Sequence, residues 1–353
     1  MGNAKTWLLI ALGTLTGLVG GAALDRNVFN LPTAPVASAS PTAQENASNH
    51  VSSLDTSGRK VSFVTVEPGV QLEVLDWGGT GETMVLLTGL GDNAHVYDQF
   101  AHQFTDRFHV IGITRRGFGR SSQPEEGYDA NTRARDDIKV LDHLHIRPAV
   151  FVGHSIAGDE LSKLGATYPD RVTKLVYLDA LEYGSPWSTL PQPPSPDYSA
   201  ADLSSVERYA AAEARNLGVR KPVSAICNML RTDSAGKVVD AISPPEIARK
   251  IVQGSVQAQY DRIQAPALAI LVPLTPKNRA VYSPYYSDLN RDKQQEFDRC
   301  FEKLQKWQAE AIQRFRTGVK NSRVVELLDS NHYVFIRDEA RVVREMRKFL
   351  LDK

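Results

Sequence analysis

Short apolar runs that recur at helix-length intervals constrain the fold of this chain most strongly. Continuous apolar runs of four to six residues are typical of strands buried on both faces. Helix-length connections between such strands indicate a parallel sheet with helices on either side. The runs lie at residues 84–87, 109–113, 149–152 and 175–178, and strand-like runs at 267–272 and 324–328 complete the count. They predict a doubly wound α/β fold.

An antiparallel hairpin is expected before these runs. Residues 61–66 and 72–77 alternate in polarity, and Pro68-Gly69 between them is a turn signal. This pattern is typical of strands with one face exposed to water. The sequence therefore predicts a sheet of eight strands, most of them parallel.

The run 149–152 leads into Gly153-His154-Ser155-Ile156-Ala157-Gly158, and a helix-like segment follows from residue 159 to 168. A tight strand-to-helix turn needs nearly side-chain-free positions around its serine, and it exposes the hydroxyl group. The helix start behind Ser155 directs N–H groups toward the place where an oxyanion would form. Ser155 is therefore the predicted nucleophile.

His332 is the predicted general base. A triad in the order serine, acid, histidine requires a base downstream of Ser155, and His332 is the only histidine beyond His154. It follows the run 324–328, so it lies on a loop that leaves the last predicted strand. From there it can accept the serine proton.

From about Val61 to the C-terminus the chain resembles the α/β-hydrolase fold family, in particular its lid-bearing, esterase-like serine hydrolases. The segment 86–91 resembles the oxyanion loop after the third strand, with Thr88 where the family usually has histidine. The segment 114–122 resembles the family's Arg-Gly-x-Gly-x-Ser loop. The serine turn and the loop at 331–333 complete four segments in the family's order.

The resemblance leaves the triad acid open. In many relatives an aspartate follows the seventh strand, but Thr275 stands there in this chain. A second family position is the end of the sixth strand, where Asp179 is the first choice and Glu182 the second. A Ser–His pair without a fixed carboxylate is the remaining alternative.

The same resemblance implies that the backbone N–H groups of Leu90 and Ile156 form the oxyanion hole. Asp92 and Asn93 follow directly in the sequence. They are candidates for substrate contact, although a role in the turn is the simpler interpretation.

A proline-rich stretch interrupts the strand rhythm at residues 184–261, which are interpreted as an inserted helical lid with helices near 200–216 and 245–256. The hydrolase core then comprises residues 58–183 and 262–353. Within it, residues 291–318 carry apolar side chains on one face and charges on another, as an amphipathic surface helix does.

The N-terminus differs in kind from the rest. Residues 7–24 form an uncharged apolar run after Lys5, which predicts a signal peptide or a membrane anchor. Residues 25–57 are rich in Ala, Ser, Thr and Pro and are interpreted as a disordered tether. We expect the protein to be exported, either periplasmic or secreted, or to be held at the membrane by residues 7–24.

Composition excludes several classes of partner. The 41 basic and 41 acidic residues balance, and no basic stripe is present, so a nucleic-acid partner is not expected. The sequence has no motif with metal-ligand spacing and no phosphate-binding loop, so neither a metal nor a cofactor is predicted. The spacing of Cys227 and Cys300 leaves a disulfide open.

These observations predict a serine hydrolase that acts on a small-molecule ester or amide, most simply a carboxylic ester, through an acyl-enzyme on Ser155. One alternative is an aminopeptidase similar to proline iminopeptidase, in which Glu207, Glu213 or Glu246 of the lid would hold a free amine. The other is a ligand-binding or sensor protein with a vestigial triad. The sequence does not identify the substrate.

Overall fold

The computed structural model of the protein describes residues 58–181 and 190–352. Its centre is one sheet with the strand order β1-β2-β4-β3-β5-β6-β9-β10. Strand β2 is antiparallel to both of its neighbours, and the other pairs are parallel. The strands are β1 (Lys60–Glu67), β2 (Val70–Gly78), β3 (Glu82–Leu87), β4 (Phe108–Thr114), β5 (Ala149–His154), β6 (Val172–Leu178), β9 (Ala267–Leu271) and β10 (Ser322–Glu326). The predicted eight-stranded, mostly parallel sheet is confirmed.

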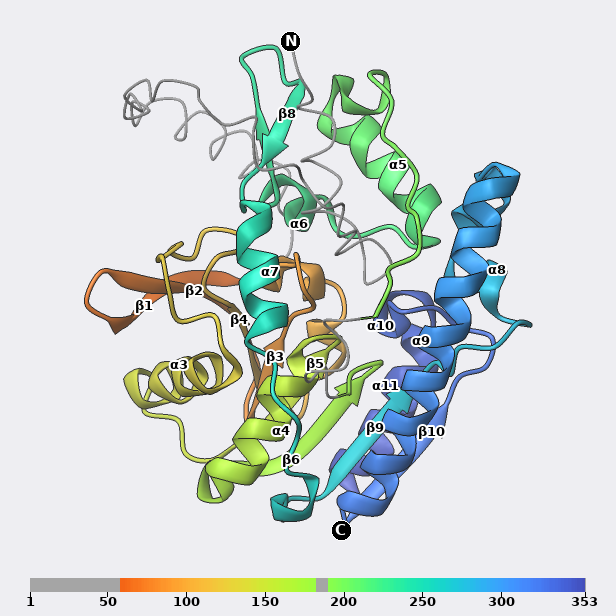
Figure 1. The fold of residues 1–353 in the computed structure, drawn as a ribbon. Helices are drawn as coiled ribbons and strands as arrows, with labels where there is room; N and C mark the ends of the chain where they lie inside the picture. Colours follow the sequence, from red (N-terminus) through yellow and green to blue (C-terminus); the bar gives the residue numbers. More distant parts are fainter. Residues whose placement is uncertain (1–57, 182–189, 353) are drawn as a thin grey trace.

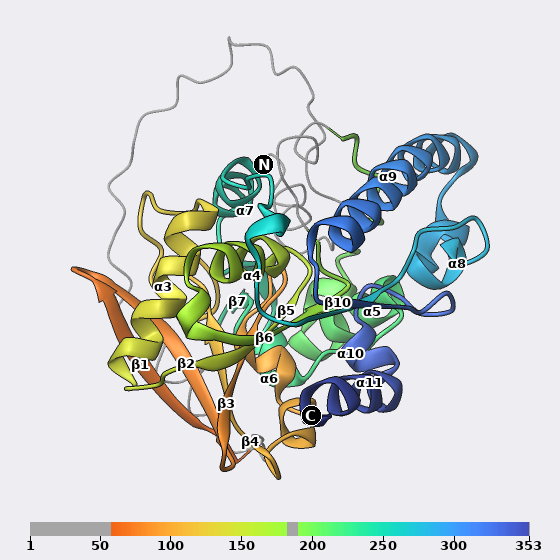
Figure 2. The same ribbon diagram turned by 90° about the horizontal axis from the view of Figure 1, so that it is seen from below.

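Helices cover both faces of the sheet, as a doubly wound fold requires (Figures 1 and 2). Side chains of α3 (Ala130–His143), α4 (Ala157–Thr167) and α9 (Arg291–Gly318) pack on one face. Those of η1 (Ala94–Tyr97), α10 (Val334–Arg337) and α11 (Glu339–Leu351) pack on the other. The central strands are buried along their length, and each buried Val, Leu or Phe contributes about 1.5–3 kcal/mol to folding.

The strand order changes direction at β3. The chain passes from β3 outward to β4 and then returns to form β5 on the other side of β3. The loops that leave the carboxyl ends of β3 and β5 therefore diverge next to each other. In α/β sheets this is the place where ligands bind.

An insertion, defined here as residues 190–261, separates β6 from β9. It contains α5 (Val206–Leu217), α6 (Val223–Cys227), a hairpin of β7 (Leu230–Thr232) and β8 (Val238–Ala241), and α7 (Pro245–Gln253). Figure 1 shows α5, α6 and β8 gathered beyond one end of the sheet. The helices near 200–216 and 245–256 agree with the sequence-based prediction, whereas α6 and the hairpin were not anticipated.

A second long connection between strands joins β9 to β10. It comprises α8 (Arg279–Tyr282), a 3₁₀ segment at Pro284–Asp288 and the long helix α9. The apolar face of α9 is buried through Phe297, Phe301 and Leu304, as its amphipathic pattern predicts. Figure 1 shows α9 running beside β9 and β10 and continuing past the sheet.

The cysteines and helices of the described residues bear on the disulfide that the sequence leaves open and on the predicted membrane anchor. In the described part of the chain Cys227 and Cys300 are both free thiols. No helix within residues 58–181 and 190–352 combines the length and apolar character that a bilayer span needs. The predicted signal or anchor at 7–24 and the predicted tether at 25–57 lie outside the described residues.

Candidate active site

Ser155 lies in the turn between β5 and α4, directly at the switch in strand order. Its φ of +57° is in the left-handed region, which non-glycine residues rarely adopt. Its backbone N–H donates to the carbonyl oxygen of Leu178 at 3.3 Å, and its own carbonyl accepts from the Gly158 N–H at 2.9 Å. A strained backbone conformation of this kind is characteristic of functional turns.

The small residues around Ser155 are required by contact. A Cβ on Gly153 would lie 2.9 Å from the Cβ of Ala157, so the two positions can be occupied only by small residues. A Cβ on Gly158 would lie 2.1 Å from the carbonyl oxygen of Leu181. Helix α4 therefore packs directly against the backbone that follows β6.

His332 and Asp179 meet at the same edge of the sheet. His332 Nδ1 lies 2.7 Å from Asp179 Oδ2, and both side chains are buried. The other carboxylate oxygen, Asp179 Oδ1, accepts the backbone N–H of Val272 at 2.8 Å. Because the carboxylate is an acceptor, His332 Nδ1 carries the proton and Nε2 presents a lone pair.

The backbone at Asp179 fixes this arrangement. Its φ of +41° is left-handed, which aspartate tolerates better than most residues, and its N–H donates to the carbonyl of Ile270 at 2.7 Å. The Tyr282 hydroxyl lies 3.5 Å from both Asp179 Oδ2 and His332 Nδ1. The second candidate acid, Glu182, lies outside the described residues.

Thr275 occupies the other family position for the acid and has a local role. Its hydroxyl lies 3.2 Å from Asn278 Oδ1, and its backbone N–H donates to the same atom at 2.8 Å. The loop after β9 is held by Gln308 of α9, whose amide accepts the Leu274 N–H and donates to the Val272 carbonyl. The long helix α9 therefore fixes the strand end that contacts Asp179.

His154 supports the loop that carries His332. Its Nε2 donates to the carbonyl oxygen of His332 at 2.9 Å, and the two rings lie 4.5 Å apart between centroids. Burial holds the pKa of His154 well below its usual range, so this ring is neutral. A Cβ on Gly89 would lie 2.8 Å from His154 Nδ1, so the ring also packs against the loop after β3.

Arg115 anchors the loop after β3, a role that the sequence did not reveal. Its guanidinium donates to the carbonyl oxygens of Thr88 at 2.7 Å and Gly89 at 2.8 Å. It also pairs with the buried carboxylate of Glu160 on α4 at 2.7 Å. The segment 114–122 contains three arginines, and only the fold reveals which of them anchors this loop.

Leu90 and Ile156 lie in the turns that follow β3 and β5. In the part of the chain that the structure describes, their backbone N–H groups donate to no other protein group. The Ile156 side chain is buried in an apolar cluster that Leu90 also contacts. Two unused N–H groups on adjacent turns are what an oxyanion hole requires.

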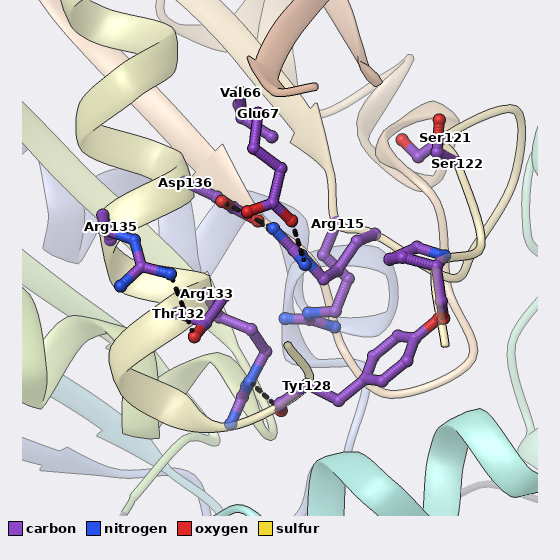
Figure 3. A network of polar contacts seen from close by, with 12 residues as sticks. Val66, Glu67, Arg115, Ser121, Ser122, Tyr128, Thr132, Arg133, Arg135 and Asp136 are labelled. Atoms are coloured by element: carbon purple, nitrogen blue, oxygen red, sulfur yellow. Dashed lines mark hydrogen bonds and ion pairs between the residues drawn. The ribbon is translucent and has the colours of Figure 1, made fainter. Parts of the chain in front are cut away.

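A second buried charge network supports the neighbouring helices. Arg116 pairs with Asp136 of α3 at 2.7 Å and with Glu67 of β1 at 2.9 Å. Figure 3 shows these two carboxylates converging, with Tyr128 and Arg133 beside them. Arg133 pairs in turn with Glu160 at 3.1 Å. This network connects the sheet edge to α3 and α4, and Glu160 links it to Arg115.

Among the described residues, no group of three or more His, Cys, Asp or Glu side chains is arranged to hold a metal ion. Asp92 and Asn93, the candidates for substrate contact, are both buried and both bonded to the insertion. Asp92 pairs with Lys221 at 2.8 Å, and the Asn93 amide donates to the Ala225 carbonyl at 3.0 Å.

Comparison with known proteins agrees with this architecture. Residues 82–222 match the family model described as alpha/beta hydrolase fold. The structure of E-2-(acetamidomethylene)succinate hydrolase superimposes with a TM-score of 0.61 at 19% identity, over 83% of this chain and all of that one. The chain therefore has the α/β-hydrolase fold.

Other α/β-hydrolase structures are similar to a comparable degree. An enol-lactonase from Burkholderia xenovorans has a TM-score of 0.56 at 18% identity, over 82% of this chain and 100% of the other. A bacterial membrane phospholipase A has a TM-score of 0.54 at 17% identity, over 87% of this chain and 91% of the other. At such identities the likeness concerns the fold alone.

Curated members of the family match over shorter regions. A 2-(acetamidomethylene)succinate hydrolase from Mesorhizobium japonicum is 34% identical over 30% of this chain and 38% of its own length. A bifunctional esterase/perhydrolase from Acinetobacter calcoaceticus is 33% identical over 34% of this chain and 45% of its own length. The chain spans about two fifths of the length of the curated relatives it matches. These two relatives are named as a hydrolase and as an esterase/perhydrolase.

Proposed function

We propose that this hydrolase cleaves carboxylic esters through an acyl-enzyme on Ser155. The observation that carries the proposal is the 2.7 Å contact between His332 and Asp179, at the sheet edge where the strained Ser155 turn lies. A histidine held by a buried carboxylate, at the same sheet edge as a serine in this type of turn, is typical of sites that activate a hydroxyl group.

In the proposed mechanism each group has one task. His332 Nε2 accepts the Ser155 proton as the oxygen attacks the carbonyl, and the same nitrogen then returns the proton to the leaving alcohol. Asp179 holds the tautomer and stabilises the imidazolium that forms. The Leu90 and Ile156 N–H groups, unused within the described chain, would stabilise the oxyanion. Water then hydrolyses the acyl-enzyme by the same route.

The contacts of the insertion favour an ester over a substrate with a free amine. Glu213 is already paired with Lys221 at 3.2 Å in a buried position. Glu246 pairs with Arg249 on the surface of α7, and Glu207 lies at the exposed start of α5. Two of these carboxylates are thus already paired and the third lies on the exposed surface, so the aminopeptidase alternative has no support from them.

The insertion is well placed to act as the lid of this enzyme. Ile247, Ile251 and Val252 of α7 belong to the apolar cluster that also contains Ile156. At the end of α7, the Ser255 hydroxyl donates to buried Asp159 of α4. These contacts support a cover over the Ser155 turn that excludes water and shapes the substrate site.

Replacement of Ser155 tests the proposal. Ser155→Ala should lose about 10⁴–10⁶-fold in kcat on p-nitrophenyl esters while it keeps the wild-type circular dichroism spectrum. A fluorophosphonate should label the native protein at Ser155 and should not label heat-denatured protein. Near-normal turnover by the folded variant would contradict the nucleophile. Native protein that resists labelling would support the vestigial sensor.

An ester panel of increasing acyl length, measured beside amino-acid anilides, then separates the substrate classes. Ester turnover at least a hundredfold above anilide turnover is expected. The reverse ranking would favour the aminopeptidase.

A further inference from the structure

Lys221 of the insertion is buried among charges at the edge of the candidate site. Its Nζ lies 2.8 Å from Asp92 Oδ1 and 3.2 Å from Glu213 Oε1, and all three side chains are almost fully buried. The same nitrogen lies 4.8 Å from the centroid of the Tyr333 ring. A buried lysine with this many partners is held in one position.

Tyr333 connects the loop after β10, which carries His332, to the loop after β3. It directly follows His332, and its hydroxyl donates to Asp92 Oδ2 at 3.1 Å. Asp92 in turn ends the loop that begins after β3, where its N–H donates to the Gly89 carbonyl at 3.3 Å. The Asp92 carboxylate therefore connects the loop of Leu90 to the loop of His332.

Lys221 provides the positive charge that this connection needs. Burial opposes its charge, but Asp92 and Glu213 outweigh that effect and raise the pKa of Lys221 well above its usual range. Without the ammonium group, Asp92 and Glu213 would be two carboxylates buried together with no cation in direct contact. Buried like charges repel strongly and disturb the groups around them.

Further contacts attach the same part of the insertion to both loops. The Asn331 amide donates to the Leu217 carbonyl at 2.8 Å, at the end of α5. The Asn93 amide donates to the Ala225 carbonyl at 3.0 Å on α6. Segment 217–225 therefore touches the loop after β3 and the loop after β10.

We propose that Lys221 is a positioning residue, which acts through Asp92 and Tyr333 to set the oxyanion donors relative to His332. The inference rests on the proposed function, because it assigns a role to Lys221 in the same reaction. Small errors in the placement of reacting groups cost large factors in rate, whereas substrate affinity depends on other contacts. Loss of this link should therefore lower kcat more than it raises KM.

Two changes interrupt the link at different points. Tyr333→Phe removes only the hydroxyl that bonds Asp92 and leaves the lysine paired. Lys221→Met combined with Glu213→Gln removes the cation together with one carboxylate, so that a single carboxylate remains. Tyr177→Phe is the matched control, because it also removes the hydroxyl of a fully buried tyrosine. That hydroxyl lies 3.3 Å from Ser162 Oγ, and Tyr177 belongs to the apolar cluster on the other face of the sheet from Tyr333.

Steady-state kinetics on a p-nitrophenyl ester, with thermal melting, give the readout. Tyr333→Phe should lower kcat about tenfold and the double variant about 10–100-fold, with KM within about threefold of wild type. The triple variant combines Tyr333→Phe with Lys221→Met and Glu213→Gln. Its kcat should be no more than about threefold below that of the double variant, because all the changes interrupt one link. Tyr177→Phe should keep the wild-type kcat.

Wild-type kcat per folded molecule in Tyr333→Phe would overturn the inference, even if the melting temperature fell. A loss of kcat in Tyr333→Phe that only equals the loss in Tyr177→Phe would also overturn the inference. If the double variant did not fold, Tyr333→Phe alone would decide. Ser155→Ala keeps the two proposals separate: turnover by that variant would refute the serine mechanism itself, whereas its inactivity beside a normal Tyr333→Phe would refute only the role of Lys221.

Discussion

At the scale of single residues, the candidate site depends on two residues whose backbone conformation is left-handed. Ser155 and Asp179 have φ values of +57° and +41°. Such conformations cost about 1–3 kcal/mol each, so the surrounding structure must stabilise them. Around Asp179 this stabilisation includes the bonds to Ile270, Val272 and His332. The strain places the carboxylate between a backbone donor and the imidazole.

Replacement of Asp179 by asparagine tests the acid. Val272 needs an acceptor at Oδ1, so the new amide would present its NH₂ group to His332. His332 would then carry its proton on Nε2 and could not accept one from Ser155. We expect a loss of about 10³–10⁴-fold in kcat with an intact fold, measured by ester kinetics and circular dichroism.

The control for this change is Glu182→Gln, for which we expect a loss of about tenfold or less. A ranking in which the Glu182 variant is the slower one would move the acid to Glu182. Wild-type rates in both variants would indicate that the enzyme works without either carboxylate.

His154 makes stability depend on pH. The folded protein keeps this ring neutral because burial lowers its pKa, whereas the unfolded chain binds a proton near pH 6.5. Below that pH the unfolded state binds more protons than the folded state, so stability falls as pH falls.

Urea unfolding between pH 7.5 and 5 measures this effect. Wild type should lose up to about 1.4 kcal/mol per pH unit below pH 6.5 relative to His154→Gln. The exposed His143→Gln should keep the wild-type slope. A wild-type slope in His154→Gln would show that this histidine is protonated equally in both states.

At the scale of elements, the start of helix α4, directly after the Ser155 turn, packs against the backbone that follows β6. Gly158 touches the Leu181 backbone, and Leu181 lies two residues after Asp179. The start of α4 therefore sets the course of the segment that carries the proposed acid.

Gly158→Ala tests this contact. The added Cβ would lie 2.1 Å from the carbonyl oxygen of Leu181. A backbone atom cannot move aside as easily as the end of a side chain can. We expect a loss of about 1–3 kcal/mol in stability and at least tenfold in kcat.

Gly165→Ala on the same helix is the matched control, because its Cβ would meet only the side chains of Leu175 and Ile263. Thermal melting and ester kinetics should show near-wild-type kcat for that variant. Equal kcat losses at the two positions would mean that the effect comes from α4 as a whole.

At the scale of the whole molecule, one sheet carries every described group of the candidate site. Its first strand begins at Lys60, directly after Arg59, whose guanidinium pairs with Asp98 at 2.9 Å. The catalytic region therefore needs the chain from about residue 58 onward. Residues 1–57 lie outside the described residues, and their composition predicts export or anchoring.

Truncation tests that division. A chain that begins at Gly58 should remain soluble, with the kcat and melting temperature of the full chain within error. A chain that begins at Lys60 should melt several degrees lower, because Asp98 loses its buried guanidinium partner. An inactive chain from Gly58 would place part of the site before it.

Fractionation of cells that express the full chain tests localisation independently. We expect it in the exported or membrane fraction. Full-length protein found only in the soluble cytoplasmic fraction would contradict the export proposal.

The sequence by itself predicted features that depend on local pattern. Six strands follow from short runs of mostly apolar residues and two from alternating polarity, and the Ser155 turn follows from small residues between a strand and a helix. His332 was predicted from its order in the chain, and Asp179 from a family position at the end of a strand. The strand and turn signals lie within a few neighbouring residues, and none of the four predictions required knowledge of distant contacts.

Only the tertiary structure revealed contacts between distant segments. Asp179 lies 153 residues from His332 in the chain, and their 2.7 Å contact depends on β6 and β10 ending at the same edge. The roles of Arg115, Gln308 and Lys221 depend on carbonyls and carboxylates contributed by other elements. Burial makes these bonds strong, and burial is a property of the folded chain that no local pattern encodes.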